Sequence, residues 1–105
     1  MYKLKFKPEV YDDVKIAYDW YESQRIGLRE DFLLALEESY SKISRTPRVY
    51  QIVHKIVRRK LLRRFPYGVF FVLQDDEVIV IAIMHTRRQP NEWRSRGLDL
   101  LEKLD

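Results

Sequence analysis

The stretch EVIVIAIM, residues 77–84, decides the fold, because eight consecutive residues carry only one charge. A strand built from these residues is apolar on both faces, which is typical of a central strand covered from two sides. The run ends at HTRRQPNEW, residues 85–93, where a histidine and two arginines stand close together. Such groups suit phosphate chemistry, nucleic-acid binding or plain solvation where a buried strand leaves the core.

Two further strands are predicted just before this one. YGVFFVLQ, residues 67–74, is joined to it by the acidic QDDE, which predicts a tight hairpin turn. KIVRRKLLRR, residues 55–64, precedes the FPYG turn and is predicted as the next strand. These segments together predict a three-strand antiparallel meander.

The N-terminal half predicts a strand and two helices. YKLKFK, residues 2–7, alternates apolar and basic side chains, which is typical of a half-buried strand. Apolar stripes at helical spacing predict helices from residue 9 to about 23 and from about 28 to 43, joined by a short link at Gly27. The order β-α-α-β-β-β predicts an α+β fold with a helical hairpin laid on one face of the meander. GLDLLEKLD, residues 97–105, is predicted as a short helix or a tail.

Length and composition limit the classes of protein. A chain of 105 residues predicts one domain over residues 1–105. The absence of cysteine excludes disulfides and thiolate chemistry and fits a reducing compartment. We find no zinc spacing and no glycine-rich phosphate loop, so we expect no metal and no cofactor. We also find neither a signal peptide nor an apolar run of membrane length, and we expect a cytoplasmic protein without membrane contact.

Charge is unevenly distributed along the chain. The formal net charge is +4, and six cations without an acid fall in residues 55–64, whereas residues 9–38 are rich in Asp and Glu. This segregation favours a dipolar molecule whose basic half meets a polyanion. The alternative is a solvated edge strand that its cations protect against aggregation.

Three segments, taken in order, resemble the RelE/ParE superfamily of toxins. They are YDWYESQRIGLREDF (18–32), RRKLLRRFPYGVFFVL (58–73) and IAIMHTRRQPNEWRSR (81–96). These toxins belong to bacterial type II toxin–antitoxin modules and are also called plasmid stabilisation proteins. The resemblance implies a cognate antitoxin. It leaves open whether the target is DNA gyrase, as in the ParE-like branch that these segments resemble more, or ribosome-bound mRNA, as in RelE-type endoribonucleases.

The nuclease interpretation is metal-independent and centres on the end of the last strand. Histidine suits acid–base work near neutral pH, and arginine stabilises a charged phosphate transition state. By resemblance, the catalytic set maps to His85, Arg87, Arg58, Lys60, Arg63 and Arg64. In a regular strand Arg63 and Arg64 would point to opposite faces. The chain departs from the nuclease pattern because no Tyr follows His85, and an isolated histidine more often has a capping or hydrogen-bonding role.

Two other sets of residues predict binding. Arg59, Arg88, Trp93 and Arg94 are candidates for contacts with nucleic acid or target, and a non-catalytic basic nucleic-acid-binding module is the third functional hypothesis. Trp93 can stack on a base but cannot move a proton. His54 is expected to be a surface residue without a specific partner.

Ile16 and Trp20 lie off the main stripe of the first helix, and Leu34 lies on the outer face of the second. They predict a patch that binds the antitoxin or a second copy of the chain, which would make a homodimer. The alternative, slightly favoured, is that Trp20 folds onto the neighbouring helix and is buried. We therefore predict a ParE-like toxin that inhibits DNA gyrase through its helical hairpin and C-terminal segment.

Overall fold

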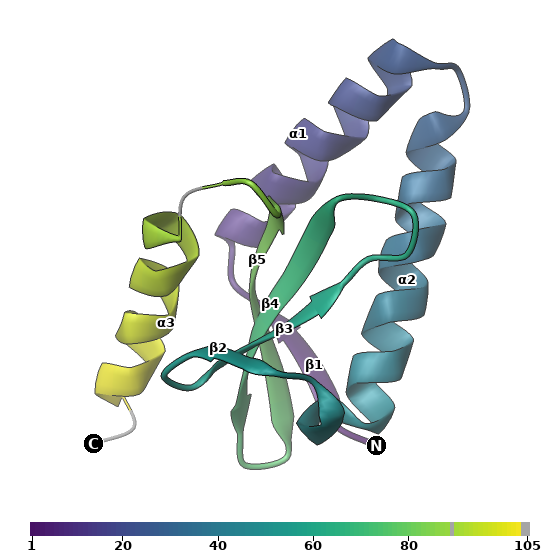
Figure 1. Cartoon of the computed structure of the whole chain (residues 1–105). Helices are drawn as coiled ribbons and strands as arrows, with labels where there is room; N and C mark the ends of the chain where they lie inside the picture. Colours follow the sequence, from purple (N-terminus) through teal and green to yellow (C-terminus); the bar gives the residue numbers. More distant parts are fainter. Residues whose placement is uncertain (89, 104–105) are drawn as a thin grey trace.

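A five-stranded mixed sheet forms the centre of the molecule, with two helices on one face and a third helix on the other (Figure 1). The structure is a computed structural model that describes residues 1–88 and 90–103. Its elements are β1 (Lys3–Phe6), α1 (Glu9–Gln24), α2 (Leu28–Arg45), the 3-10 helix η1 (Pro47–Val49), β2 (Ile52–His54), β3 (Val57–Leu61), β4 (Tyr67–Gln74), β5 (Glu77–His85) and α3 (Asn91–Lys103). The α+β prediction is confirmed. Within the described ranges, no helix is long and apolar enough to span a membrane.

The sheet has the order β1-β5-β4-β3-β2, so β5 lies between a parallel neighbour, β1, and an antiparallel one, β4. The stretch at residues 77–84 is therefore a central strand, as its composition predicts. Within it, Val78, Val80 and Ala82 are completely buried. The β4–β5 hairpin closes through Asp75, whose positive φ of 56° suits a tight turn.

The strand predicted over residues 55–64 is confirmed only for Val57–Leu61, which form β3. The chain forms a second hairpin, β2–β3, whose turn contains Lys55 in the left-handed region with φ 51°. No glycine marks this turn, so the sequence gives no signal for it. Because β3 ends at Leu61, Arg63 and Arg64 lie in the β3–β4 turn and do not alternate across a strand; Arg64 has φ 74°.

Separate apolar cores cover the two faces of the sheet. The helical hairpin buries one face with α1 residues such as Ala17 and Tyr21 and α2 residues such as Phe32 and Ile43. On the other face, Trp93 and Leu100 of α3 cover side chains of β3, β4 and β5, namely Val57, Phe70, Val72, Ile81, Ala82 and Met84. The third helix thus supplies the second cover that an all-apolar central strand requires.

The predicted C-terminal helix begins too late. It was expected from residue 97, but α3 starts at Asn91 and contains Gly97 in its middle; residues 104 and 105 lie outside the described residues. A Cβ at Gly97 would lie 2.5 Å from Cγ2 of Val57. The glycine, which weakens a helix pattern in the sequence, therefore permits the close approach of α3 to β3.

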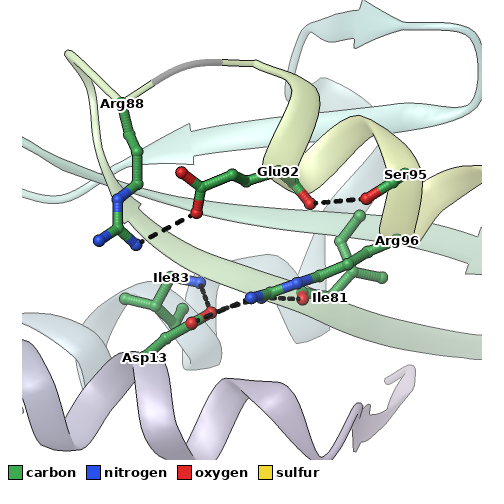
Figure 2. A network of polar contacts seen from close by, with 7 residues as sticks. All are labelled: Asp13, Ile81, Ile83, Arg88, Glu92, Ser95 and Arg96. Carbon is green, nitrogen blue, oxygen red and sulfur yellow. Dashed lines mark hydrogen bonds and ion pairs between the residues drawn. The ribbon is translucent and has the colours of Figure 1, made fainter.

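An ion pair occupies the place where β1 stops. The last residue of β1, Phe6, pairs with Val80, so β5 continues beyond its parallel neighbour. There the Asp13 carboxylate accepts the Ile83 N–H at 3.0 Å, and the Arg96 guanidinium donates to the Ile81 carbonyl at 2.9 Å. Asp13 and Arg96 also pair with each other at 2.6 and 3.2 Å, as Figure 2 shows.

This pair joins all three layers of the molecule, because Asp13 belongs to α1, Arg96 to α3 and the backbone groups to β5. The Asp13 and Arg96 side chains are only 6% and 17% exposed. A shift of register places Ile81 without a partner in β4, which redirects the backbone of β5 toward the pair. Removing one partner would leave a buried charge without its counterion.

We predict that Asp13→Asn lowers the free energy of unfolding by about 3 kcal/mol, the usual cost of breaking a buried pair on one side. Urea denaturation followed by circular dichroism measures this. The matched control is Asp19→Asn, which breaks an exposed pair with Lys15 on the same helix and should leave the unfolding midpoint unchanged. Equal midpoints for Asp13→Asn and the wild type would contradict the role of the pair.

Gly97→Ala should destabilise the protein by about 1–3 kcal/mol, because the new methyl group overlaps Val57 in a packed interface. Thermal unfolding measures the loss. Ser95→Ala, an exposed change in the same helix, is the control for general effects on helix stability. The double variant Gly97→Ala/Val57→Ala should recover part of the loss, and additive effects would rule out the close approach as the cause.

Candidate functional site

His85 ends β5 and lies beside an aromatic partner. It lies opposite Tyr67 of β4 in the strand register, and the centroids of the two rings are 5.4 Å apart in an edge-to-face arrangement. The Nδ1 atom accepts the N–H of Arg87 at 3.0 Å, so the neutral ring carries its proton on Nε2. This contact is the hydrogen-bonding role expected for an isolated histidine, and it shapes the loop that leaves the strand.

A hollow of about 430 Å³ opens next to this histidine, and we call it the α1 hollow. Its walls are mostly apolar, and Ile16 and Trp20 stand at its edge with 61% and 54% of their surface exposed. It is lined by Ile16, Trp20, Tyr21, Pro66, Tyr67 and His85. The expectation that Trp20 is buried against the neighbouring helix is wrong, because its ring packs edge to face on Tyr21 of its own helix at 5.0 Å.

Leu34 does not belong to the α1 hollow. It is 64% exposed and lines a second hollow of about 230 Å³ between α2 and the β3–β4 turn. Arg63 and Arg64 face acidic residues of α2 there; the lining is Asp31, Leu34, Ala35, Glu38, Arg63, Arg64 and Phe65. The predicted apolar patch is therefore divided between two places, and only Ile16 and Trp20 share one.

The structure does not bring the predicted nuclease residues together. Arg58 donates through Nη1 to the carbonyls of Arg48 and Tyr50 at 3.1 and 2.8 Å. Lys60 lies 5.8 Å from the centroid of the Tyr50 ring, and burial together with nearby Lys42 lowers its pKa. Both therefore hold the η1 segment against β3.

Of the remaining members of that set, Arg87 contacts His85 through its backbone N–H. Arg63 and Arg64 line the second hollow, between α2 and the β3–β4 turn, and the side chain of Arg87 is exposed in the loop after β5. The cation that lines a hollow with His85 is Arg88, in a space of about 60 Å³ that also includes Asp13 and Ile16. Arg88 pairs with Glu92 at 3.5 Å (Figure 2). The two hollows described here that His85 lines include none of the predicted catalytic cations.

Trp93 cannot stack on a nucleic-acid base in this structure. It is 6% exposed, and its ring stacks on Phe70 with centroids 4.6 Å apart. The guanidinium of Arg94 lies 5.5 Å from the centroid of the same ring. His54, expected to have no partner, lies in β2 with its ring 6.2 Å from that of Trp93. The prediction for Trp93 is therefore wrong, and this aromatic cluster is part of the core.

The sequence interpretation missed Asp13 and Arg96. Asp13 lies three residues after Val10 and four before Ala17, so it falls on the buried stripe of α1. A carboxylate on an apolar stripe is a signal for a buried partner of opposite charge. The identity of that partner, 83 residues away, has no signal in the sequence.

The fold is that of a small α+β domain with a helical hairpin on one face of a mixed sheet. Residues 4–90 match the family model described as "ParE toxin of type II toxin-antitoxin system, parDE". The chain belongs to the ParE toxin family. The resemblance found in the sequence is thereby confirmed. No curated protein sequence matches the chain.

Solved structures share the fold at low sequence identity. A chromosomal ParDE system from P. aeruginosa superposes with a TM-score of 0.72 and 18% identity, covering 81% of this chain and 96% of that one. An E. coli RelE mutant in complex with an antitoxin RelB peptide gives 0.58 and 17%, covering 91% and 93%. The isolated E. coli RelE toxin gives 0.55 and 16%, covering 96% and 99%. The RelE structures are thus less similar in fold than the ParDE structure.

The tyrosines near the hairpin core should make stability fall in alkaline solution. Burial raises the pKa of Tyr21, with a contribution from Tyr67, and burial also raises the pKa of Tyr40 and of Tyr67. Unfolded tyrosines release their protons near pH 10, before the folded ones do. The stabilisation is therefore complete below about pH 10 and is lost as the pH rises through the folded-state values.

Urea unfolding measures this loss of stability. It is carried out between about pH 8 and 11, a range that brackets the ordinary pKa of tyrosine. Tyr21→Phe keeps the ring but removes the ionisable hydroxyl, so it should flatten the decline in stability. Tyr11→Phe, at a side chain that is 70% exposed, should keep the wild-type decline. Identical profiles for all three proteins would contradict this account.

Proposed function

We propose that this ParE-family toxin inhibits DNA gyrase and that a cognate antitoxin neutralises it. The observation that carries the proposal is the α1 hollow, where Ile16 and Trp20 present exposed apolar surface beside a concavity. Surfaces of this kind mark sites of protein–protein contact. Aromatic anchors next to pockets contribute a large share of binding energy at such interfaces.

The position of the cations favours protein binding over RNA cleavage. Cleavage through a ribose 2′-hydroxyl needs an acid–base group and cations around one phosphate. Here Arg58 and Lys60 donate hydrogen bonds to backbone carbonyls, whereas His85 borders an apolar hollow. The nearer likeness to ParDE than to RelE supports the same choice. The proposed target is the gyrase protein, and we propose that the toxin acts in the cytoplasm.

The α1 hollow is also the proposed site of neutralisation. Structures of similar fold include an E. coli RelE mutant with an antitoxin RelB peptide and the intact E. coli RelBE toxin–antitoxin complex, the latter at a TM-score of 0.54 and 16% identity. We infer that the antitoxin of this chain covers Ile16 and Trp20. Antitoxin and gyrase would then compete for one surface, and neutralisation would need no change in the fold of the toxin.

A gyrase supercoiling assay with the purified chain tests the proposal. The wild type should inhibit supercoiling, and Ile16→Ala/Trp20→Ala should weaken inhibition at least about tenfold, because each truncated anchor costs more than about 1 kcal/mol. Ile26→Ala removes an equally apolar side chain that is 91% exposed at the hairpin tip, and it should inhibit as the wild type does.

Two results would overturn the proposal. One is intact gyrase activity together with cleavage of mRNA in cell-free translation that His85→Ala abolishes, which would establish a ribonuclease. The other is a stable dimer, measured by sedimentation, that Ile16→Ala/Trp20→Ala converts to monomers without any effect on gyrase. In that case the α1 hollow would be occupied by a second copy of the chain.

A further inference from the structure

Three cations gather on the sheet face that α3 partly covers, away from the helical hairpin. We call Lys55, Arg59 and Arg94 the cationic face. Lys55 and Arg94 line one crevice between the β2–β3 turn and α3, together with His54. Arg59 stands on the neighbouring strand, where its Cα partner is Phe70. Because Phe70 stacks on Trp93 and Arg94 lies over Trp93, one aromatic pair connects Arg59 with Arg94.

Gly68 in β4 helps to place Arg59 on this face. A Cβ at Gly68 would lie 3.1 Å from both Cγ and Cδ of Arg59. The absence of a side chain therefore lets the aliphatic stem of Arg59 lie across β4, directed along the face. Arg94 is held similarly, since its guanidinium rests against the buried Trp93 ring. Two of the three cations thus have fixed stems, which lowers the entropy lost when they bind an anion.

The cationic face has no acidic partners among the described residues. The ion pairs that involve α3 are formed by other cations, namely Lys7, Arg88 and Arg96. None of the described ion pairs includes Lys55, Arg59 or Arg94. The Nε of Arg94 is buried and makes no hydrogen bond within the described part of the chain. Burial, Arg94 and Lys55 lower the pKa of His54, in that order, so positive charge accumulates here. An external polyanion would relieve this repulsion.

The aromatic residues of this face indicate which polyanion fits. Single-stranded nucleic acid is bound by exposed rings on which bases stack. Phe70 and Trp93 are only 2% and 6% exposed, so the cationic face offers fixed cations but no stacking platform. Arrays of cations without base contacts bind the phosphates of a duplex, independent of sequence. The exposed Trp20 lies elsewhere, at the α1 hollow.

We propose that Lys55, Arg59 and Arg94 bind the phosphate backbone of duplex DNA. The face is separate from the α1 hollow, so the toxin can contact DNA and a protein at the same time. If gyrase is the target, the contact would be with DNA that gyrase holds, but binding to DNA alone does not depend on that proposal. Arg94 lies in α3, beyond the residues 4–90 that match the family model. This face is therefore completed by a segment outside the family match.

Binding of the full chain to a labelled 20-base-pair duplex, measured by fluorescence anisotropy without gyrase, tests the proposal. We expect micromolar affinity at low salt and a slope of log K against log salt of about −2.7, because three cations displace about 0.9 counterion each. Lys55→Gln/Arg59→Gln should reduce the slope to about −0.9. Lys15→Gln/Arg25→Gln removes the same charge from the hairpin and should keep the wild-type slope.

A second measurement does not depend on these variants. His54 lies in the same crevice, so its ring signals in NMR spectra should shift when the duplex is added, whereas those of His85 should not. The proposal is overturned by equal slopes for Lys55→Gln/Arg59→Gln and the wild type, or by unchanged His54 signals. It is also overturned if single-stranded DNA or polyglutamate of matched charge binds as tightly as the duplex. A wild type that binds no DNA but still inhibits gyrase would refute the cationic face and leave the proposed function standing.

Discussion

The central strand is longer than its parallel neighbour, and the arrangement of the molecule depends on how that difference is resolved. Beyond Val80, β5 has no strand on one side, and two side chains satisfy its backbone instead. Asp13 and Arg96 reach this edge from opposite faces, so one ion pair fixes α1, β5 and α3 together (Figure 2). An unpaired strand edge would invite association with another chain, and here it is closed within the domain.

The same pair positions both candidate binding surfaces. Ile16 and Trp20 follow Asp13 by three and seven residues, so they lie on the same side of α1 and are carried to the end of β5 beside His85. Arg94 precedes Arg96 by two residues, which turns it toward β2 and β3. An apolar hollow and a cationic face therefore lie on opposite sides of one sheet, and each has the chemistry of a different kind of partner.

Much of the fold follows from patterns that the sequence displays. The all-apolar run at 77–84, the helical stripes and the QDDE turn predict the central strand, the helical hairpin and the β4–β5 hairpin. The β2–β3 turn does not follow, because Lys55 adopts a positive φ without a glycine to mark it. The start of α3 is missed because Gly97 resembles a helix end, although its role is close packing on Val57. The site is the least predictable part, since the sides to which Arg58, Arg59 and Lys60 point depend on a strand register that only the folded sheet defines.

The pairing of the first strand with the last has a consequence for synthesis. β1 leaves the ribosome early, yet its partner β5 begins 74 positions later, at Glu77 opposite Lys3. Until then, the helical hairpin has no central strand to cover, and the wall that His85 gives to the α1 hollow does not exist. At about 5–20 residues per second, translation delays this closure by about 4–15 seconds. The nascent toxin is therefore without its candidate binding surface until the chain is almost complete.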